Sequence, residues 1–243
     1  HHYVAVHDIS EKTVTIYIDG ALAGGTESLE TYSGTSIIDD QATSNKIYIG
    51  GTTYPMNGII DDVSVFKGTA FTLAQVQELY NDGVPLDATN HTQKANLVGY
   101  WRNRGTDTWT DDSTNTNDGT VNGSPDTIYF PKGSQAGRDS QGMVLTNTRS
   151  NEGLILDGVA DYVKVADADS LDLTTSATWA LWMKQEAIDV TAAILGKGTS
   201  TNLVRFYTSS NGLFYFVIMD GSSNSGYFNY STAISANTWH YLT

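Results

Sequence analysis

Cysteine is absent from this chain of 243 residues, and proline is scarce, with four residues. The absence of cysteine excludes disulfide bridges and thiol catalysis, and it leaves the cellular compartment open. No hydrophobic run approaches the roughly 18 residues that a membrane-spanning helix requires. We therefore expect no insertion into a membrane.

Basic residues are few as well. Lysine and arginine together number 13, against 27 aspartates and glutamates, and the formal net charge is −14. A negative field of this size repels phosphate backbones, so nucleic acid is not an expected partner. The same field favours solubility and the binding of cations.

Glycine and aromatic residues are abundant, with 23 glycines, 14 tyrosines, 7 phenylalanines and 5 tryptophans. This composition can fill a packed core and supply many tight turns between short strands. Runs rich in β-branched residues, such as Thr13–Ile18 and Ile59–Phe66, predict strands, and Asp19-Gly20 predicts a hairpin turn. The pattern indicates a globular protein built mainly of β-strands.

One helix is predicted, over residues 72–82. Thr72 is placed to cap its N-terminus, and Gln75, three residues later, completes a capping box. Gly83 is placed to end the helix. The apolar residues that fall on one helical face are Leu73, Val76, Leu79 and Tyr80.

The segment Gly58–Gly83, which reads GIIDDVSVFKGTAFTLAQVQELYNDG, resembles the closing strand and helix of a laminin G-like domain. The runs HHYVAV and TVTIYIDG near the start, and LDGVADYV, SLDL and TWALWMK further on, are also similar to motifs of these domains. Laminin G-like domains are part of the concanavalin A-like lectin/glucanase superfamily. The resemblance implies an all-β concanavalin A-like jelly-roll sandwich of two antiparallel sheets with one short helix.

The motifs stand in an unusual order. Residues 1–83 resemble the C-terminal half of the sandwich, residues 84–95 are interpreted as a linker, and residues 96–243 resemble the N-terminal half. The chain is thus similar to a circularly permuted domain, or to the end of one tandem repeat followed by the start of the next. Half a sandwich exposes an apolar face and unpaired edges. The missing half is therefore expected either from the same chain folding back or from a neighbouring copy.

The resemblance also implies a structural calcium ion. In related domains the ion joins an early D-x-S-G turn, an F-D-G turn and the closing strand, and the matching residues here are Asp111, Asp157 and Asp62. Loops rich in oxygen atoms suit Ca²⁺, which takes about six to eight oxygen ligands. The alternative is that these aspartates form Asx-turns and bond backbone amides only.

Five aromatic residues lie in or beside turn-rich segments and are candidates for stacking on a sugar ring: Tyr54, Trp109, Tyr207, Tyr227 and Tyr230. The alternative for each is a place in the core or on a strand face. Three arginines in or near irregular segments are candidates for holding an anionic group: Arg102, Arg104 and Arg138. The last of them falls in a long polar stretch, residues 128–153, and a solvated surface position is the alternative for all three.

Catalysis is not expected. Related glycoside hydrolases need two carboxylates, usually supplied by one strand that reads E-x-D-x-x-E. None of the glutamates falls in that pattern, no G-x-S-x-G motif is present, and the 5 histidines are scattered. The sequence therefore indicates a protein that is not an enzyme.

We expect a non-catalytic recognition or adhesion module that forms part of an extracellular or virion-surface protein. Its expected ligand is a glycan. Runs such as VGYW and NDGTVNGSP are similar to proteins of bacteriophages and bacterial surfaces, which suggests a tail-fibre or capsid-decoration role. The alternative is a structural subunit of a virion or filament, whose neighbouring copies assemble by exchanging halves of the sandwich.

Overall fold

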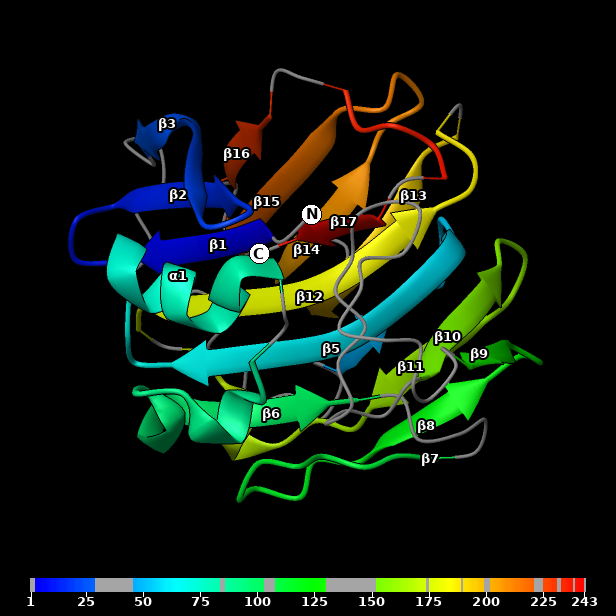
Figure 1. The fold of residues 1–243 in the computed structure, drawn as a ribbon, viewed down its shortest axis with the longest axis horizontal. Helices are drawn as coiled ribbons and strands as arrows, with labels where there is room; N and C mark the ends of the chain where they lie inside the picture. The colour runs from blue at the N-terminus through cyan, green and yellow to red at the C-terminus, as the bar shows by residue number, and fades with distance from the viewer. Residues whose placement is uncertain are drawn as a thin grey trace.

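The computed structural model describes residues 3–28, 46–83, 86–102, 108–129, 152–173, 175–188, 190–198, 202–220, 225–230, 233–237 and 239–242. These residues form two antiparallel β-sheets that pack face to face, with one α-helix on the outside (Figure 1). The predicted all-β sandwich with one short helix is confirmed.

The larger sheet has nine strands, in the order β3-β2-β1-β12-β5-β10-β9, with β17 added to β12 and β6 added to β5. Its strands are β1 (Tyr3–Asp8), β2 (Thr13–Ile18), β3 (Ala21–Ser28), β5 (Asn57–Lys67), β6 (Leu97–Trp101), β9 (Asp126–Tyr129), β10 (Glu152–Asp157), β12 (Ala177–Gln185) and β17 (Trp239–Leu242).

The second sheet has eight strands, in the order β16-β15-β14-β13-β4-β11-β8-β7. They are β4 (Ile47–Ile49), β7 (Thr108–Trp109), β8 (Gly119–Asn122), β11 (Tyr162–Val165), β13 (Ala192–Gly198), β14 (Asn202–Thr208), β15 (Phe214–Asp220) and β16 (Ser225–Asn229). In Figure 1, β14 passes behind β12 of the larger sheet.

Strands from distant parts of the chain alternate within both sheets. β4, from the first third of the chain, lies between β11 and β13. β12 in turn lies between β1 and β5. One chain thus supplies the strands of both the 1–83 part and the 96–243 part to a single sandwich. Circular permutation and exchange of halves between copies both stay predictions, because the structure contains one chain.

β1 and β17 occupy the same edge of β12, one after the other (Figure 1). Tyr3 in β1 pairs with Leu181, and the pairing continues toward the start of β12. Leu242 in β17 pairs with Leu181 too, and that pairing continues toward the end of β12. Each terminal segment therefore fills a different part of one strand position beside β12.

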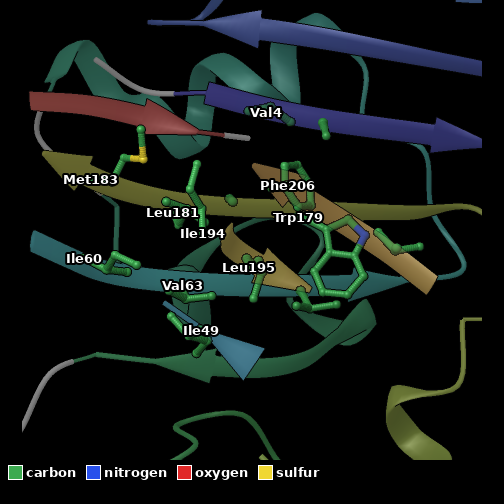
Figure 2. Close-up of a cluster of buried hydrophobic side chains, with 14 of the residues drawn as sticks. Val4, Ile49, Ile60, Val63, Trp179, Leu181, Met183, Ile194, Leu195 and Phe206 are labelled. Atoms are coloured by element: carbon green, nitrogen blue, oxygen red, sulfur yellow. The ribbon is translucent and has the colours of Figure 1, made fainter. Parts of the chain in front are cut away.

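The core lies between the inner faces of the two sheets. Figure 2 shows Trp179, Leu181 and Met183 of β12 among apolar side chains from β4, β5, β13 and β14. The ring of Trp179 meets Phe206 edge to face, with the centroids 6.0 Å apart. Full burial of each such side chain contributes about 1.5–3 kcal/mol. Apolar packing between the sheets is therefore the main force that holds the sandwich together.

The helix α1 (Leu73–Tyr80) begins as the sequence predicts. The Thr72 hydroxyl accepts a hydrogen bond from the backbone N–H of Gln75, and the Gln75 side-chain oxygen accepts one from the backbone N–H of Thr72. The helix packs against the turn between β2 and β3, where the Gln77 amide donates to the carbonyl of Gly20 at 3.1 Å. The predicted capping box is confirmed.

The end of the helix differs from the prediction. The chain leaves the helix at Asn81, whose φ of 47° is left-handed, because a short polar side chain tolerates this conformation. Gly83 ends the short 3₁₀ turn η1 (Asn81–Gly83) that follows. Leu73, predicted on the buried face, is 44% exposed, and the buried residues of the helix are Val76 and Leu79.

The predicted linker is packed against the sandwich where it is described. It contains the 3₁₀ turns η2 (Ala88–Asn90) and η3 (Lys94–Asn96); a further turn, η4 (Asp169–Leu171), precedes β12.

His91 is fully buried and its ring stacks on Phe71 at 4.7 Å. Its Nδ1 accepts from the N–H of Gln93, so the proton lies on Nε2, which donates to the carbonyl of Gln75 at 2.9 Å. Burial lowers the pKa of His91 and favours this neutral form, against the opposing effects of that carbonyl and the nearby Glu78.

Candidate ligand-binding site

A hollow of about 310 Å³ lies on the outer face of the eight-stranded sheet. Residues of β14, β15 and β16 contribute most of its walls and floor. Its volume falls at the small end of the range of roughly 300–1,000 Å³ that is typical of ligand pockets. The lining residues are Tyr54, Thr191, Leu203, Arg205, Tyr207, Val217, Met219 and Tyr227.

Three of the five aromatic residues predicted to bind a ligand meet in this hollow: Tyr54, Tyr207 and Tyr227. Tyr54 is 46% exposed and Tyr227 is 57% exposed, which is unusual for large rings in a packed protein. Leu203 and Val217, by contrast, are buried and form an apolar floor. The hollow therefore presents exposed aromatic rings around a hydrophobic base.

Strand register places these side chains on one face. Arg205 of β14 lies opposite Val217 of β15, which lies opposite Tyr227 of β16. Directly paired residues of antiparallel strands point to the same side of a sheet. Because side chains alternate along a strand, Leu203, Arg205 and Tyr207 point outward while Val204 and Phe206 enter the core.

Tyr207 is further held by its pair on β15. The rings of Tyr207 and Tyr215 stack 4.9 Å apart, with 8° between their planes. Burial raises the pKa of Tyr207, and the neighbouring Tyr215 and Tyr227 raise it further, while the positive charge of Arg205 acts in the opposite direction. The Tyr207 hydroxyl thus stays protonated at neutral pH and is able both to donate and to accept a hydrogen bond.

Tyr54 reaches the hollow from the loop that follows β4. Two bonds fix this loop to β13: the Tyr54 carbonyl accepts from the N–H of Ala193, and the N–H of Gly50 donates to the carbonyl of Ile194, each at 2.6 Å. Gly51 has a φ of 73°, and a Cβ at this position would lie only 2.5 Å from the Cβ of Ala193. Glycine is therefore needed here for the loop to lie close enough to the sheet.

A second, smaller hollow of about 180 Å³ adjoins the first. The two share Leu203 and Arg205, and the second extends across β13 to Tyr48 of β4. Gly196 of β13 lies opposite both Tyr48 and Arg205 and adds no side chain between them. We call the two hollows together the outer groove.

The remaining two predicted aromatic residues lie elsewhere. Trp109, in β7, is fully buried, so a ligand has no access to its ring, and the prediction of a binding role for it is corrected. Tyr230 is half-buried, packs against the core and donates its N–H to the carbonyl of Phe214 at 2.9 Å. Neither residue lines the outer groove.

Asp62 and Asp111, two of the predicted calcium ligands, contact the same residue. The Tyr100 hydroxyl donates to Asp62 at 2.6 Å, and the Tyr100 backbone N–H donates to Asp111 at 2.8 Å. Asp62 sits in a bulge of β5 with a φ of 52°, and both aspartates are buried. Asp111 also accepts from Ser113 and Asn117, which forms the Asx-turn considered as the alternative.

Asp157, the third predicted ligand, lies apart from the other two. It is exposed at the end of β10, where it accepts hydrogen bonds from the N–H groups of Val159 and Ala160. Its partner Asn57 stands five residues before Asp62 along β5, a distance of about 16 Å in an extended strand. Among the residues that the structure describes, no group of three or more His, Asp or Glu side chains is placed to hold a metal ion. The three aspartates do not fit one calcium ion as a set, and calcium binding stays a prediction.

Arg102, one of the three arginines singled out from the sequence, does not line the outer groove. Arg102 pairs with Asp112 and Asp87, and its guanidinium lies 5.1 Å from the centre of the Tyr100 ring. It ties the described part of the linker to the start of the second half of the chain. Arg104 and Arg138 lie outside the described residues, as do residues 130–151 of the long polar stretch.

Residues 1–77 match the family model of the concanavalin A-like lectin/glucanases superfamily. The resemblance to a laminin G-like domain is thereby confirmed over those residues, while the similarity to phage proteins stays a prediction. Comparison with curated proteins and with solved structures gives no match. The superfamily match supports a carbohydrate-binding or adhesion module in general. Within the described ranges, no helix has the length and apolar character needed to cross a membrane.

Proposed function

We propose that the protein is a non-catalytic recognition module that binds glycan in the outer groove. The observation that carries the proposal is the pair of exposed rings, Tyr54 and Tyr227, beside a floor of buried Leu203 and Val217. A sugar ring has one apolar face and a rim of hydroxyl groups. The face of an aromatic ring packs against the apolar face of the sugar, and the Tyr and Arg side chains at the edge form hydrogen bonds with its hydroxyl groups.

The lining of the groove supports binding rather than hydrolysis. Glycoside hydrolysis by the common mechanism needs two carboxyl groups on either side of the scissile bond. Among the described residues, the groove lining contains no aspartate or glutamate. A sugar held there meets tyrosine, arginine and threonine side chains, which orient it without supplying an acid and a base.

An extracellular or virion-surface location is part of the proposal. Laminin G-like domains are commonly extracellular. Burial of an extensive apolar core stabilises the fold without disulfides, so the absence of cysteine is compatible with an extracellular location. The phage-like sequence runs VGYW and NDGTVNGSP support a role in attachment to a host surface.

Glycan-array binding tests the proposal. Tyr227→Ala removes one exposed ring and should lower the affinity for the bound glycan about tenfold, as expected for loss of an aromatic contact of about 1–2 kcal/mol. Leu22→Ala is the matched control, because Leu22 is 52% exposed but lies in β3 of the other sheet. Equal affinities of wild type and Tyr227→Ala, or no binding to any glycan, would contradict the proposal.

The alternation of strands from the two parts of the chain also supports the alternative function, a structural subunit that assembles by exchange of sandwich halves. Because β4 and β12 each lie between strands from the other part of the chain, an opened chain would present edges that fit a second copy. Light scattering distinguishes the two functions. A monomer that binds glycan favours recognition, whereas a dimer or polymer without glycan binding favours assembly by exchange.

A further inference from the structure

The outer groove differs in charge from the rest of the chain. The chain has 27 acidic and 13 basic residues. The strands of the eight-stranded sheet reverse this ratio, with three basic residues, Lys164, Lys197 and Arg205, and one acidic residue, Asp220. Asp220 ends β15, opposite Asn202. Among the described residues, the lining of the outer groove thus contains basic side chains and no carboxylate.

Arg205 stands at the centre of this face. It lines both hollows and lies between the ring of Tyr227 on one side and that of Tyr48 on the other. Within the described part of the chain, its guanidinium makes no ion pair or hydrogen bond, in contrast to Arg102 and Lys197, which aspartates hold. The planar guanidinium has donors arranged to bind a carboxylate or sulfate through two parallel hydrogen bonds.

A second cation stands in the same row. Pairing runs across the sheet from Lys164 through Tyr48 and Gly196 to Arg205, and all paired residues share one face. Three strand spacings separate Lys164 from Arg205, or about 14 Å. The row therefore offers two positive charges along the direction in which an extended ligand would cross the strands.

We infer that the ligand of the outer groove is an acidic glycan, which places a carboxylate or sulfate group on Arg205 and a sugar ring against Tyr54 or Tyr227. This inference rests on the proposed function and adds the chemical class of its ligand. The net charge of −14 repels polyanions in general. Selection for an acidic sugar must therefore come from close contact with Arg205, and the long-range field does not supply it.

The experiment measures binding by calorimetry for two pairs of oligosaccharides. Oligogalacturonate is compared with its methyl ester, and a sulfated galactan oligosaccharide with its desulfated form, so the two pairs separate carboxylate from sulfate recognition. Wild type should prefer the acidic member of at least one pair by about tenfold or more, the size expected for a charge-assisted hydrogen bond. Arg205→Gln should abolish that preference, so that the acidic and the neutral member bind with similar affinity.

Two further variants complete the design. Lys94→Gln removes an exposed charge from η3, away from the groove, and should keep the preference. Lys164→Gln should weaken longer acidic chains more than short ones. If wild type binds acidic and neutral sugars equally, and Tyr227→Ala weakens the binding of both, the inference of an acidic ligand is overturned. The proposed function of glycan binding would still stand. Failure of every sugar to bind would overturn the proposed function as well.

Discussion

Leu242 and Tyr3 pair with the same residue of β12, Leu181. The last and first described residues of the chain therefore meet on one sheet edge, and β17 continues into β1 as two pieces of one strand would. This geometry is what circular permutation of a sandwich predicts, because the two ends of a permuted chain arise from one cut in an otherwise continuous strand.

A reordered chain tests the permutation. It starts at residue 86, joins Leu242 to Tyr3 through a short Gly/Ser linker, and ends at residue 83. We expect it to fold with unchanged circular dichroism and a melting temperature within a few degrees of the parent, because every strand pairing is kept. The control carries the same join but is cut between Ala180 and Leu181, which divides β12, and should not fold. Aggregation of the first variant would count against permutation.

His7 in β1 makes stability depend on pH. The side chain is fully buried, and within the described residues neither ring nitrogen has a hydrogen-bond partner. Burial lowers its pKa from 6.5 to about 4, against the opposing charge of Asp8. The unfolded chain therefore takes up a proton near pH 6.5, whereas the folded chain does so only near pH 4.

Stability contributed by neutral His7 is present above pH 6.5 and lost as the pH falls toward 4. The lowering of the His7 pKa from 6.5 to about 4 corresponds to a contribution of about 3 kcal/mol to the free energy of unfolding. We expect His7→Leu to flatten the fall in the free energy of unfolding between these pH values, as measured by urea denaturation. His91 is also buried with a lowered pKa, so His91→Phe is a comparison in which the His7 contribution persists. An unchanged slope in His7→Leu would show that another group is responsible.

Substitution of Lys197 measures the cost of removing a buried cation from two carboxylates. Its side chain is fully buried in β13, and its Nζ lies 3.2 Å from Asp167 and 3.3 Å from Asp172, which are partly exposed. Lys197→Met leaves two carboxylates facing each other without a cation and should destabilise the fold by about 3 kcal/mol in urea unfolding. Adding Asp167→Asn and Asp172→Asn to Lys197→Met should recover part of this loss. No recovery would mean that packing, and not charge, sets the cost.

Local sequence patterns predicted the elements well and their ends less well. The capping box of Thr72 and Gln75 is local, so the start of α1 followed from the sequence. Its end did not, because Asn81 adopts the left-handed conformation two residues before the predicted Gly83. The fold was predicted from the resemblance to a known superfamily, which the family model matches over residues 1–77. The periodicity of the sequence alone does not show the order of the strands.

The site was predicted in part. Tyr54, Tyr207 and Tyr227 were named from their place in turn-rich segments, but their meeting in one hollow depends on the insertion of β4 beside β13. Arg205 was missed, although the alternation of Leu203, Arg205 and Tyr207 in β14 was a signal that they share a face. The aspartate trio failed to converge because Asp157 and Asp62 lie at separate positions along the sheet.

The place of β4 has a consequence for the order of folding. Its three residues bridge β11 and β13, which follow it by roughly 110 residues or more, and such distant contacts are slow to form. Until β4 docks, the eight-stranded sheet is two separate pieces, and the loop that carries Tyr54 is not yet held against β13. The groove is thus expected to form among the last events of folding. If the proposed function is right, binding of its glycan ligand should recover during refolding with the slowest kinetic phase.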